Sequence, residues 1–262
     1  MTKIALTIAG SDSGGGAGIQ ADLRTFAFHR VHGASAITCV TAQNTVGVKK
    51  VEAISLATIT AQIEAVTEDL QVDAVKTGML LNREILEAIA VYEFKNLVVD
   101  PVMVSRTGVQ LIDREAVACL QQLLIPQAAI VTPNRYEAQI LSGLEIKTLE
   151  DLKQAAIAIY ERWGKVVLAK GGGLEGKEQG SDIWYDGKEL RILAETTVDT
   201  KNTHGTGCTL SAAICANLAL GKDLWSAVIE AKKYVTIALQ HSLDIGAGNG
   251  PVGHFFSLII KS

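Results

Sequence analysis

Aromatic residues make up only 5% of this 262-residue chain, whereas 48% of its residues are hydrophobic and 20% are charged. So large an aliphatic share excludes a disordered chain and an extended interaction scaffold. No segment concentrates Lys and Arg, and the net charge is −4, so we expect no nucleic-acid partner. We interpret the basic pairs Lys49-Lys50 and Lys232-Lys233 as solvated positions on helices or turns.

Long apolar runs and closely spaced cysteines are also lacking. No window reaches the roughly 18 apolar residues of a membrane helix, and the apolar run at 4–9 is too short for the core of a signal peptide. The four cysteines have no C-x-x-C spacing and stand mostly in apolar segments, which is typical of reduced thiols. We therefore expect a cytoplasmic protein with no membrane partner.

Short aliphatic runs alternate with amphipathic segments along the whole chain. Strands are expected at 4–9, 35–42, 74–76, 97–100, 128–132 and 166–170, and in a hairpin of 182–185 with 190–193. Helices are expected at 18–29, 58–70, 149–163, 206–220 and 224–241. This alternation predicts one α/β domain over 1–262, with a mostly parallel sheet between two layers of helices. Ligands are then expected at the carboxyl ends of the strands.

Two glycine-rich segments follow expected strands. Gly205 and Gly207 stand where a loop becomes a helix, so bare amides and the helix dipole could receive an anion there, although a simple capped turn has the same pattern. Cys208 follows in the first turn, where a helix N-terminus lowers the pKa of a thiol, so it could act as a base or nucleophile. Segment 9–22 has four glycines in five residues but matches neither G-x-G-x-x-G nor a Walker A motif, which favours a substrate loop.

Charged residues end three further expected strands. Asp100 and Glu137 could together hold a water-ligated Mg²⁺, while Glu137 could equally form a capping box with Asn134. Lys170 precedes three glycines and suits a phosphate contact, unless it is an ordinary surface lysine. Met79 follows a similar lysine at 76 and is more typical of a core position.

Seven segments of the chain together resemble one family, in order and over nearly the whole length. They are AGSDSGGGAGIQAD (9–22), TAQNT (41–45), KTGML (76–80), DPVM (100–103), TPNRYEA (132–138), KGG (170–172) and DTKNTHGTGCTLSAA (199–213). They are similar to those of the hydroxymethylpyrimidine/phosphomethylpyrimidine kinases of thiamine biosynthesis, in the ribokinase-like superfamily. The GTGC segment is the most telling, because related sugar kinases carry aspartate in place of its cysteine. The resemblance implies a three-layer α/β sandwich and an ATP-dependent kinase, often a homodimer.

The resemblance also implies roles for single residues. Cys208 matches the catalytic base, and Gly205, Thr206 and Gly207 match the anion hole for the transferred phosphoryl group. The pyrimidine would be bound by Gly10, Ala17, Asp22, Gln43 and Met79. ATP would be bound by Lys170, Asn134 and Thr203, and Mg²⁺ by Asp100 and Glu137. Two positions depart from the family pattern, with Arg106 in a loop where relatives have lysine and Gly173 where many have histidine.

Three other functions stay open at this point. A pyridoxal kinase of the same superfamily would also phosphorylate a hydroxymethyl group on an aromatic ring. A cysteine hydrolase could use Cys208 as nucleophile and His204 as base. A binding protein without turnover would keep the pocket alone, which the intact set of catalytic residues disfavours.

Overall fold

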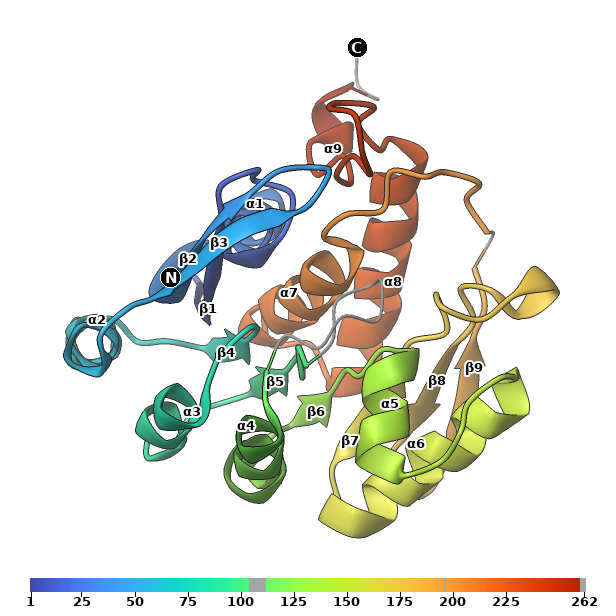
Figure 1. Cartoon of the computed structure of the whole chain (residues 1–262), viewed down its shortest axis with the longest axis horizontal. Coiled ribbons are helices and arrows are strands. Elements are labelled where there is room, and N and C mark those ends of the chain that lie inside the picture. Colours follow the sequence, from blue (N-terminus) through green and yellow to red (C-terminus); the bar gives the residue numbers. More distant parts are fainter. Residues whose placement is uncertain (104–111, 196, 260–262) are drawn as a thin grey trace.

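The computed structural model describes residues 1–103, 112–195 and 197–259 of the chain (Figure 1). Within these residues nine strands form one sheet in the order β3-β2-β1-β4-β5-β6-β7-β8-β9. The parallel strands are β1 (Ile4–Asp12), β2 (His32–Gln43), β4 (Ala74–Thr77), β5 (Leu97–Val99), β6 (Ile130–Val131) and β7 (Val166–Ala169). The antiparallel ones are β3 (Val48–Ala53) at one edge, and β8 (Asp182–Tyr185) and β9 (Leu190–Leu193) at the other.

Helices cover both faces of the sheet, as predicted. One face packs against α1 (Gly18–Phe28), α7 (Thr206–Ala219) and α8 (Leu224–Gln240). The other packs against α2 (Leu56–Asp69), α3 (Arg83–Ala90), α4 (Arg114–Cys119), α5 (Arg135–Ser142) and α6 (Leu149–Trp163). A short α9 (Phe256–Ile259) lies near the C-terminus (Figure 1). Side chains alternate along each strand, so Ala5 enters one core and Leu6 the other. The predicted three-layer sandwich is confirmed.

The elements that position the site follow from their sequences. From Thr209 to Ala219 every residue of α7 is buried, since this helix lies between the sheet and its neighbours α1 and α8. Helix α5 begins with the capping box that the sequence allowed, in which Asn134 and Glu137 bond each other's backbone. Because the central strands are parallel, their carboxyl ends and the N-terminus of α7 lie at the same edge of the sheet.

Some expectations about secondary structure were wrong or incomplete. Strand β1 continues three residues beyond its predicted end at Ala9, with a register shift before Ser11. Strand β3 was not predicted, since all of its residues are exposed and give no burial pattern; Lys49 and Lys50 lie on it rather than on a helix or turn. Helices α3 and α4 were also missed. Arg106 lies outside the described residues.

The structure also bears on the cysteines and on membrane-spanning segments. All four cysteines lie in the described part of the chain and are free thiols. None of the described helices has the length and apolarity needed to cross a lipid bilayer.

Candidate active site

The N-terminus of α7 is shaped by a glycine in the left-handed region. Gly205 is the N-cap residue with a φ of 80°, and no side chain caps the helix. A Cβ atom on Gly205 would lie 1.8 Å from the carbonyl oxygen of Gly16, so the glycine loop packs directly on this turn. The first amides of a helix have no partner within it, and they carry the positive end of its dipole. Gly205, Thr206, Gly207 and Cys208 therefore present an anion-binding edge to the cavity that they line.

Replacing Gly205 with alanine should destabilise the fold strongly. The left-handed backbone and the clash with Gly16 act together, and we expect a loss of about 2–5 kcal/mol in the free energy of unfolding. Gly47→Ala is the matched control, because a Cβ there meets nothing within 4 Å. Urea denaturation of both variants measures the difference; equal stabilities would show that the contact between the two loops is misplaced.

A cavity of about 560 Å³ opens at this edge of the sheet. It brings together ten of the site residues expected from the sequence: Ala17, Asp100, Asn134, Glu137, Lys170, Thr203, Gly205, Thr206, Gly207 and Cys208. These residues come from the loops after β1, β5, β6, β7 and β9 and from the first turns of α5 and α7. The volume suits a nucleotide-sized ligand.

Buried charges of both signs lie at the base of the cavity. Lys170 Nζ is 2.9 Å from Asp100 Oδ1, and Ser211 of α7 donates to Asp100 Oδ2 at 3.0 Å. A Cβ on Gly207 would lie 3.3 Å from Lys170 Nζ, so this ammonium group stands beside the helix N-terminus. Burial alone would raise the pKa of the Asp100 carboxyl, but Lys170 and Lys76 hold it below its usual value.

Glu137 differs from Asp100, although the two face the same cavity. Glu137 Oε2 accepts from the amide of Asn134 at 2.8 Å, and Oε1 faces the amide of Met103 at 3.4 Å. Burial raises the pKa of Glu137 to about 8. The positive charge of Lys170 opposes this rise, and the negative charge of Asp100 adds to it. Glu137 thus forms the capping box and also lines the cavity, so the two interpretations made from the sequence are compatible.

Cys208 is partly exposed and its environment is not the one expected from its place on the helix. Burial raises the pKa of its thiol to about 11; Lys76 opposes the rise, and Asp22 and Asp100 add to it. The prediction of a lowered pKa was therefore wrong. Desolvation and two nearby carboxylates outweigh the helix dipole and one ammonium group.

The raised pKa predicts how fast Cys208 is alkylated at different pH values. At pH 8 a thiol with a pKa of about 11 has about one hundredth of the thiolate that an ordinary thiol, with a pKa near 9, would have. The rate of carboxamidomethylation at Cys208, followed by mass spectrometry of its peptide, should still be rising at pH 9.5. Free Cys-containing peptide is the control, and a plateau near pH 8 in the protein would contradict the account. The other cysteines are buried.

The residues expected to bind the pyrimidine form a separate group beside the cavity. A Cβ on Gly10 would lie 2.9 Å from Met79 Cε and 2.7 Å from Cys39 Sγ, so these three residues converge. The Gln43 carboxamide lies 3.3 Å from His204 Nε2, and His204 lines the cavity. Gly10, Met79 and Gln43 are thus near the cavity without lining it, and Ala17 lies in its wall.

Asp22 occupies a different position from the one that the resemblance implied. Its side chain is fully buried, where Oδ2 accepts from Lys76 Nζ at 2.7 Å and from Thr7 at 2.6 Å. Oδ1 is buried without a hydrogen-bond partner. A direct bond from Asp22 to a pyrimidine is not available in this conformation, because the carboxylate is enclosed beneath the site and engaged with the equally buried Lys76.

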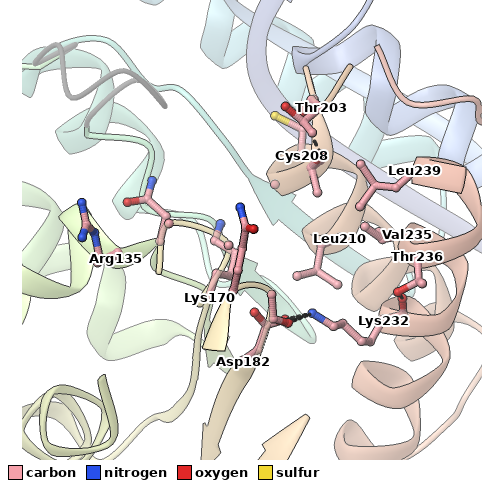
Figure 2. Close-up of a pocket in the computed structure, with 18 of the residues that line it drawn as sticks. Arg135, Lys170, Asp182, Thr203, Cys208, Leu210, Lys232, Val235, Thr236 and Leu239 are labelled. Atoms are coloured by element: carbon pink, nitrogen blue, oxygen red, sulfur yellow. Dashed lines mark hydrogen bonds and ion pairs between the residues drawn. The ribbon is translucent and has the colours of Figure 1, made fainter. Parts of the chain in front are cut away.

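The cavity also contains functional candidates that the sequence analysis missed. Lys232 was interpreted as solvated, yet its Nζ lies 2.7 Å from Asp182 Oδ2 and both side chains line the cavity (Figure 2). Val228 and Val235, four residues before and three after, are also on the inner side of α8, and this spacing could have placed Lys232 there. In Figure 2, Val235 and Leu239 form an apolar wall, with Arg135 across the cavity.

His204 is not arranged as the base of a cysteine hydrolase. Its Nε2 lies 2.8 Å from Asp12 Oδ2 and 3.3 Å from the Gln43 carboxamide. Nε2 is thus directed toward β1 and β2. The hydrolase hypothesis required an imidazole nitrogen in contact with Cys208.

Comparison with known proteins agrees with this geometry. A family model described as phosphomethylpyrimidine kinase matches residues 12–253. A hydroxymethylpyrimidine/phosphomethylpyrimidine kinase of Synechococcus elongatus is 57% identical over 258 residues, covering 97% of this chain and 98% of that protein. The crystal structure of phosphomethylpyrimidine kinase from Clostridium difficile is similar at a TM-score of 0.81 and 43% identity, covering 91% of this chain and 100% of that one. The ADP complex of Bacillus subtilis pyridoxal kinase is similar at a TM-score of 0.91 and 38% identity, covering 99% and 100%.

Proposed function

Because this chain belongs to the phosphomethylpyrimidine kinase family, we propose that it phosphorylates 4-amino-5-hydroxymethyl-2-methylpyrimidine with ATP. In a second step it would phosphorylate the resulting monophosphate to the pyrophosphate. One observation carries the proposal: Cys208 lies at the open N-terminus of α7, in the same cavity as Lys170. A proton acceptor and a phosphate-binding cation therefore face one space.

ATP would occupy this cavity. Lys170, Asn134 and Thr203 would contact its phosphates, and the amides of Gly205, Thr206 and Gly207 would receive the charge that grows on the transferred group. The apolar wall of Leu210, Val235 and Leu239 suits the base. Phosphoryl transfer needs alignment and positive charge more than covalent help, and this site provides both. An ATP-consuming enzyme with free thiols also fits the cytoplasm.

Asp100 and Glu137 fit a magnesium ion held through water. Both are oxygen donors in the cavity wall, which Mg²⁺ prefers, and their existing bonds to Lys170, Ser211 and backbone amides leave other lone pairs open. Among the described residues no three His, Cys, Asp or Glu side chains gather as metal ligands, so phosphates and water would complete the shell. When bound there, Mg²⁺ would neutralise phosphate charge and offset the carboxylates that raise the pKa of Cys208.

Cys208 would take the proton of the substrate hydroxyl. Since its pKa is about 11 in the free protein, the thiolate is a small fraction at neutral pH, and this fraction grows about tenfold for each pH unit. A thiolate with a high pKa is in turn a strong proton acceptor. Lys76 stabilises the thiolate from beneath the site, and Asp22 holds Lys76 there. Asp22 thereby acts through Lys76 rather than on the pyrimidine.

The aminopyrimidine would lie between Gly10, Ala17, Met79 and Gln43. Its ring has an edge with one donor and one acceptor, which matches the carboxamide of Gln43. Met79 and the bare backbone of Gly10 would contact its apolar faces, where a side chain on Gly10 would meet Met79 and Cys39. The hydroxymethyl arm then points toward Cys208.

Pyridoxal is the second candidate substrate, because the structure is also close to a pyridoxal kinase. A coupled ADP-release assay with the hydroxymethylpyrimidine, its monophosphate and pyridoxal separates the two. We expect both pyrimidines to be phosphorylated with a higher kcat/KM than pyridoxal. A strict preference for pyridoxal would refute the proposal, and so would absence of ADP release with every substrate.

We also propose that the chain works as a homodimer paired through strand β3. This strand lies at the edge of the sheet, and its side chains Val48 and Val51 are exposed. An edge strand with exposed apolar side chains can pair with a strand of another molecule. Lys50 and Glu52 form an exposed ion pair on it. In an antiparallel pair of two β3 strands centred on Val51, Lys50 of each copy would face Glu52 of the other, so the edge is complementary to itself in charge.

A charge at the centre of this edge should separate the copies. Val51→Glu would place two like charges opposite each other, and the variant should sediment as a monomer of 27.8 kDa while the unaltered chain sediments at twice that mass. Val91→Glu is the control, since Val91 is 76% exposed on the loop after α3 and should leave the dimer intact. If both variants sediment as dimers, the dimer interface does not include β3.

A further inference from the structure

The glycine loop and the start of α7 are joined through one imidazole. Asp12 at the end of β1 accepts from three amides of the loop, those of Gly14 (2.8 Å), Gly16 (3.1 Å) and Ala17 (2.9 Å). Its Oδ2 is also 2.8 Å from His204 Nε2. A Cβ on Gly16 would lie 2.2 Å from His204 Cδ2, so the ring packs closely on the loop. The position of this imidazole is therefore fixed from two sides.

The hydrogen on His204 is fixed by the same contacts. Burial would raise the pKa of the Asp12 carboxyl, but hydrogen bonds from His204 and the loop amides hold it below the usual value, so Asp12 is ionised at neutral pH. An ionised carboxylate only accepts hydrogen bonds. The His204 nitrogen that faces Asp12, Nε2, must therefore carry its hydrogen.

This proton position determines how the Gln43 carboxamide is turned. The carboxamide lies 3.3 Å from the same Nε2, and two N–H groups cannot bond each other, so its oxygen must face His204. The amide nitrogen then faces Thr41 Oγ1, 3.3 Å from the other end of the carboxamide. Thr41 gives its only hydrogen to the carbonyl oxygen of Ser11 at 3.0 Å, which leaves its oxygen free to accept. In this arrangement the single Nε2 hydrogen is shared between Asp12 at 2.8 Å and the Gln43 oxygen at 3.3 Å, and Thr41 accepts from the Gln43 amide.

We propose that His204, held by Asp12, sets the direction of the Gln43 carboxamide and thereby the direction in which an aminopyrimidine ring docks. The inference rests on the proposed function, in which Gln43 pairs with the donor–acceptor edge of the ring. Turning the carboxamide would exchange its donor and acceptor, and the ring could then pair only when turned over. His204 is a positioning residue for substrate selectivity, acting through Gln43.

A double-mutant cycle in steady-state kinetics tests this role. His204→Leu removes the donor, and we expect the KM for the hydroxymethylpyrimidine to rise about tenfold while the KM for ATP stays within about threefold. His204→Gln keeps an N–H group within reach of Asp12 and should restore most of the loss. In a Gln43→Ala background, His204→Leu should add little. In His204→Leu, the KM for pyridoxal, which lacks the amino group, should rise less than the KM for the hydroxymethylpyrimidine.

Other results would overturn the inference. If His204→Leu raises the pyrimidine KM equally with and without Gln43, or raises the ATP KM as much, His204 only supports the loop. If the KM for the hydroxymethylpyrimidine is as high in His204→Gln as in His204→Leu, His204 likewise only supports the loop. If the unaltered chain does not turn over the hydroxymethylpyrimidine at all, the proposed function itself fails, which is a distinct outcome. Thermal unfolding of each variant identifies loss of fold; if His204→Leu does not fold, the Gln43→Ala comparison is made with His204→Phe, which keeps an aromatic ring against the loop but has no N–H group.

Discussion

Replacement of Cys208 by serine should lower kcat by about 10²–10⁴-fold, because a serine hydroxyl is far less acidic than a thiol and cannot accept the substrate proton near neutral pH. The KM for ATP should change little, since in the proposed site the phosphates would be held by Lys170 and by backbone amides that the substitution leaves in place. Steady-state kinetics with the hydroxymethylpyrimidine and ATP measure both values.

The same helix offers a matched control. Cys215 lies two turns further along α7 and is fully buried, with burial raising the pKa of its thiol far above the usual range. Cys215→Ser should therefore keep near-normal kcat, whatever it does to stability. If Cys208→Ser turned over at the rate of the unaltered enzyme, Cys208 would not be the base, and the site would function by positioning and charge alone.

Asp100→Asn should raise the Mg²⁺ concentration needed for half-maximal activity by about tenfold or more, because one of the two proposed oxygen donors would lose its charge. Lys170 would also lose the carboxylate at 2.9 Å that now fixes its ammonium group, so the KM for ATP should rise as well. A titration of activity with Mg²⁺ at fixed ATP gives the first value, and an ATP titration at saturating Mg²⁺ gives the second.

Asp186→Asn is the control for this carboxylate-to-amide change. Asp186 is in the exposed β8–β9 turn, where its Oδ1 accepts from two backbone amides, a role that asparagine can keep. It should leave the Mg²⁺ requirement unaltered. An unchanged requirement in Asp100→Asn would remove Asp100 from the metal site and leave its bonds to Lys170 and Ser211 as its role.

The layered fold could be predicted from the sequence because its signals are local. The aliphatic runs at 97–100 and 166–170 are buried on both faces and read as strands without reference to their neighbours. Helix α7 begins at Thr206 as expected, since Gly205 provides the left-handed turn before it. Strand β3 carries no such signal, because its residues are all exposed and its pairing with β2 depends on a contact across the sheet.

The site was predictable in its members but less so in their environments. The sequence shows which residue types follow the strands, among them the glycines, Lys170 and Cys208. The parallel sheet then brings these residues to one edge. The pKa of Cys208 was mispredicted because the sequence shows its place on a helix but not the desolvation and the carboxylates around it. The burial of Asp22 against Lys76 could not be predicted for the same reason, because the two residues are 54 positions apart in the sequence.

The link from Asp12 through His204 to Gln43 was also invisible to the sequence, since 192 and 161 residues separate the partners of His204 from it. Such long-range bonds join the substrate loop, the strand edge and the catalytic helix into one unit. In the proposed mechanism, selectivity for the ring and removal of the hydroxymethyl proton would then depend on neighbouring residues of one segment, 204–208.

The most direct measurement of the central claim is a crystal structure of the chain with the hydroxymethylpyrimidine and a non-hydrolysable ATP analogue. We predict that the hydroxymethyl oxygen lies within hydrogen-bond distance of Cys208 Sγ, on the side from which the terminal phosphate, bound by Lys170, approaches. If the ring binds elsewhere, or its hydroxyl points away from the sulfur, the proposed mechanism is contradicted.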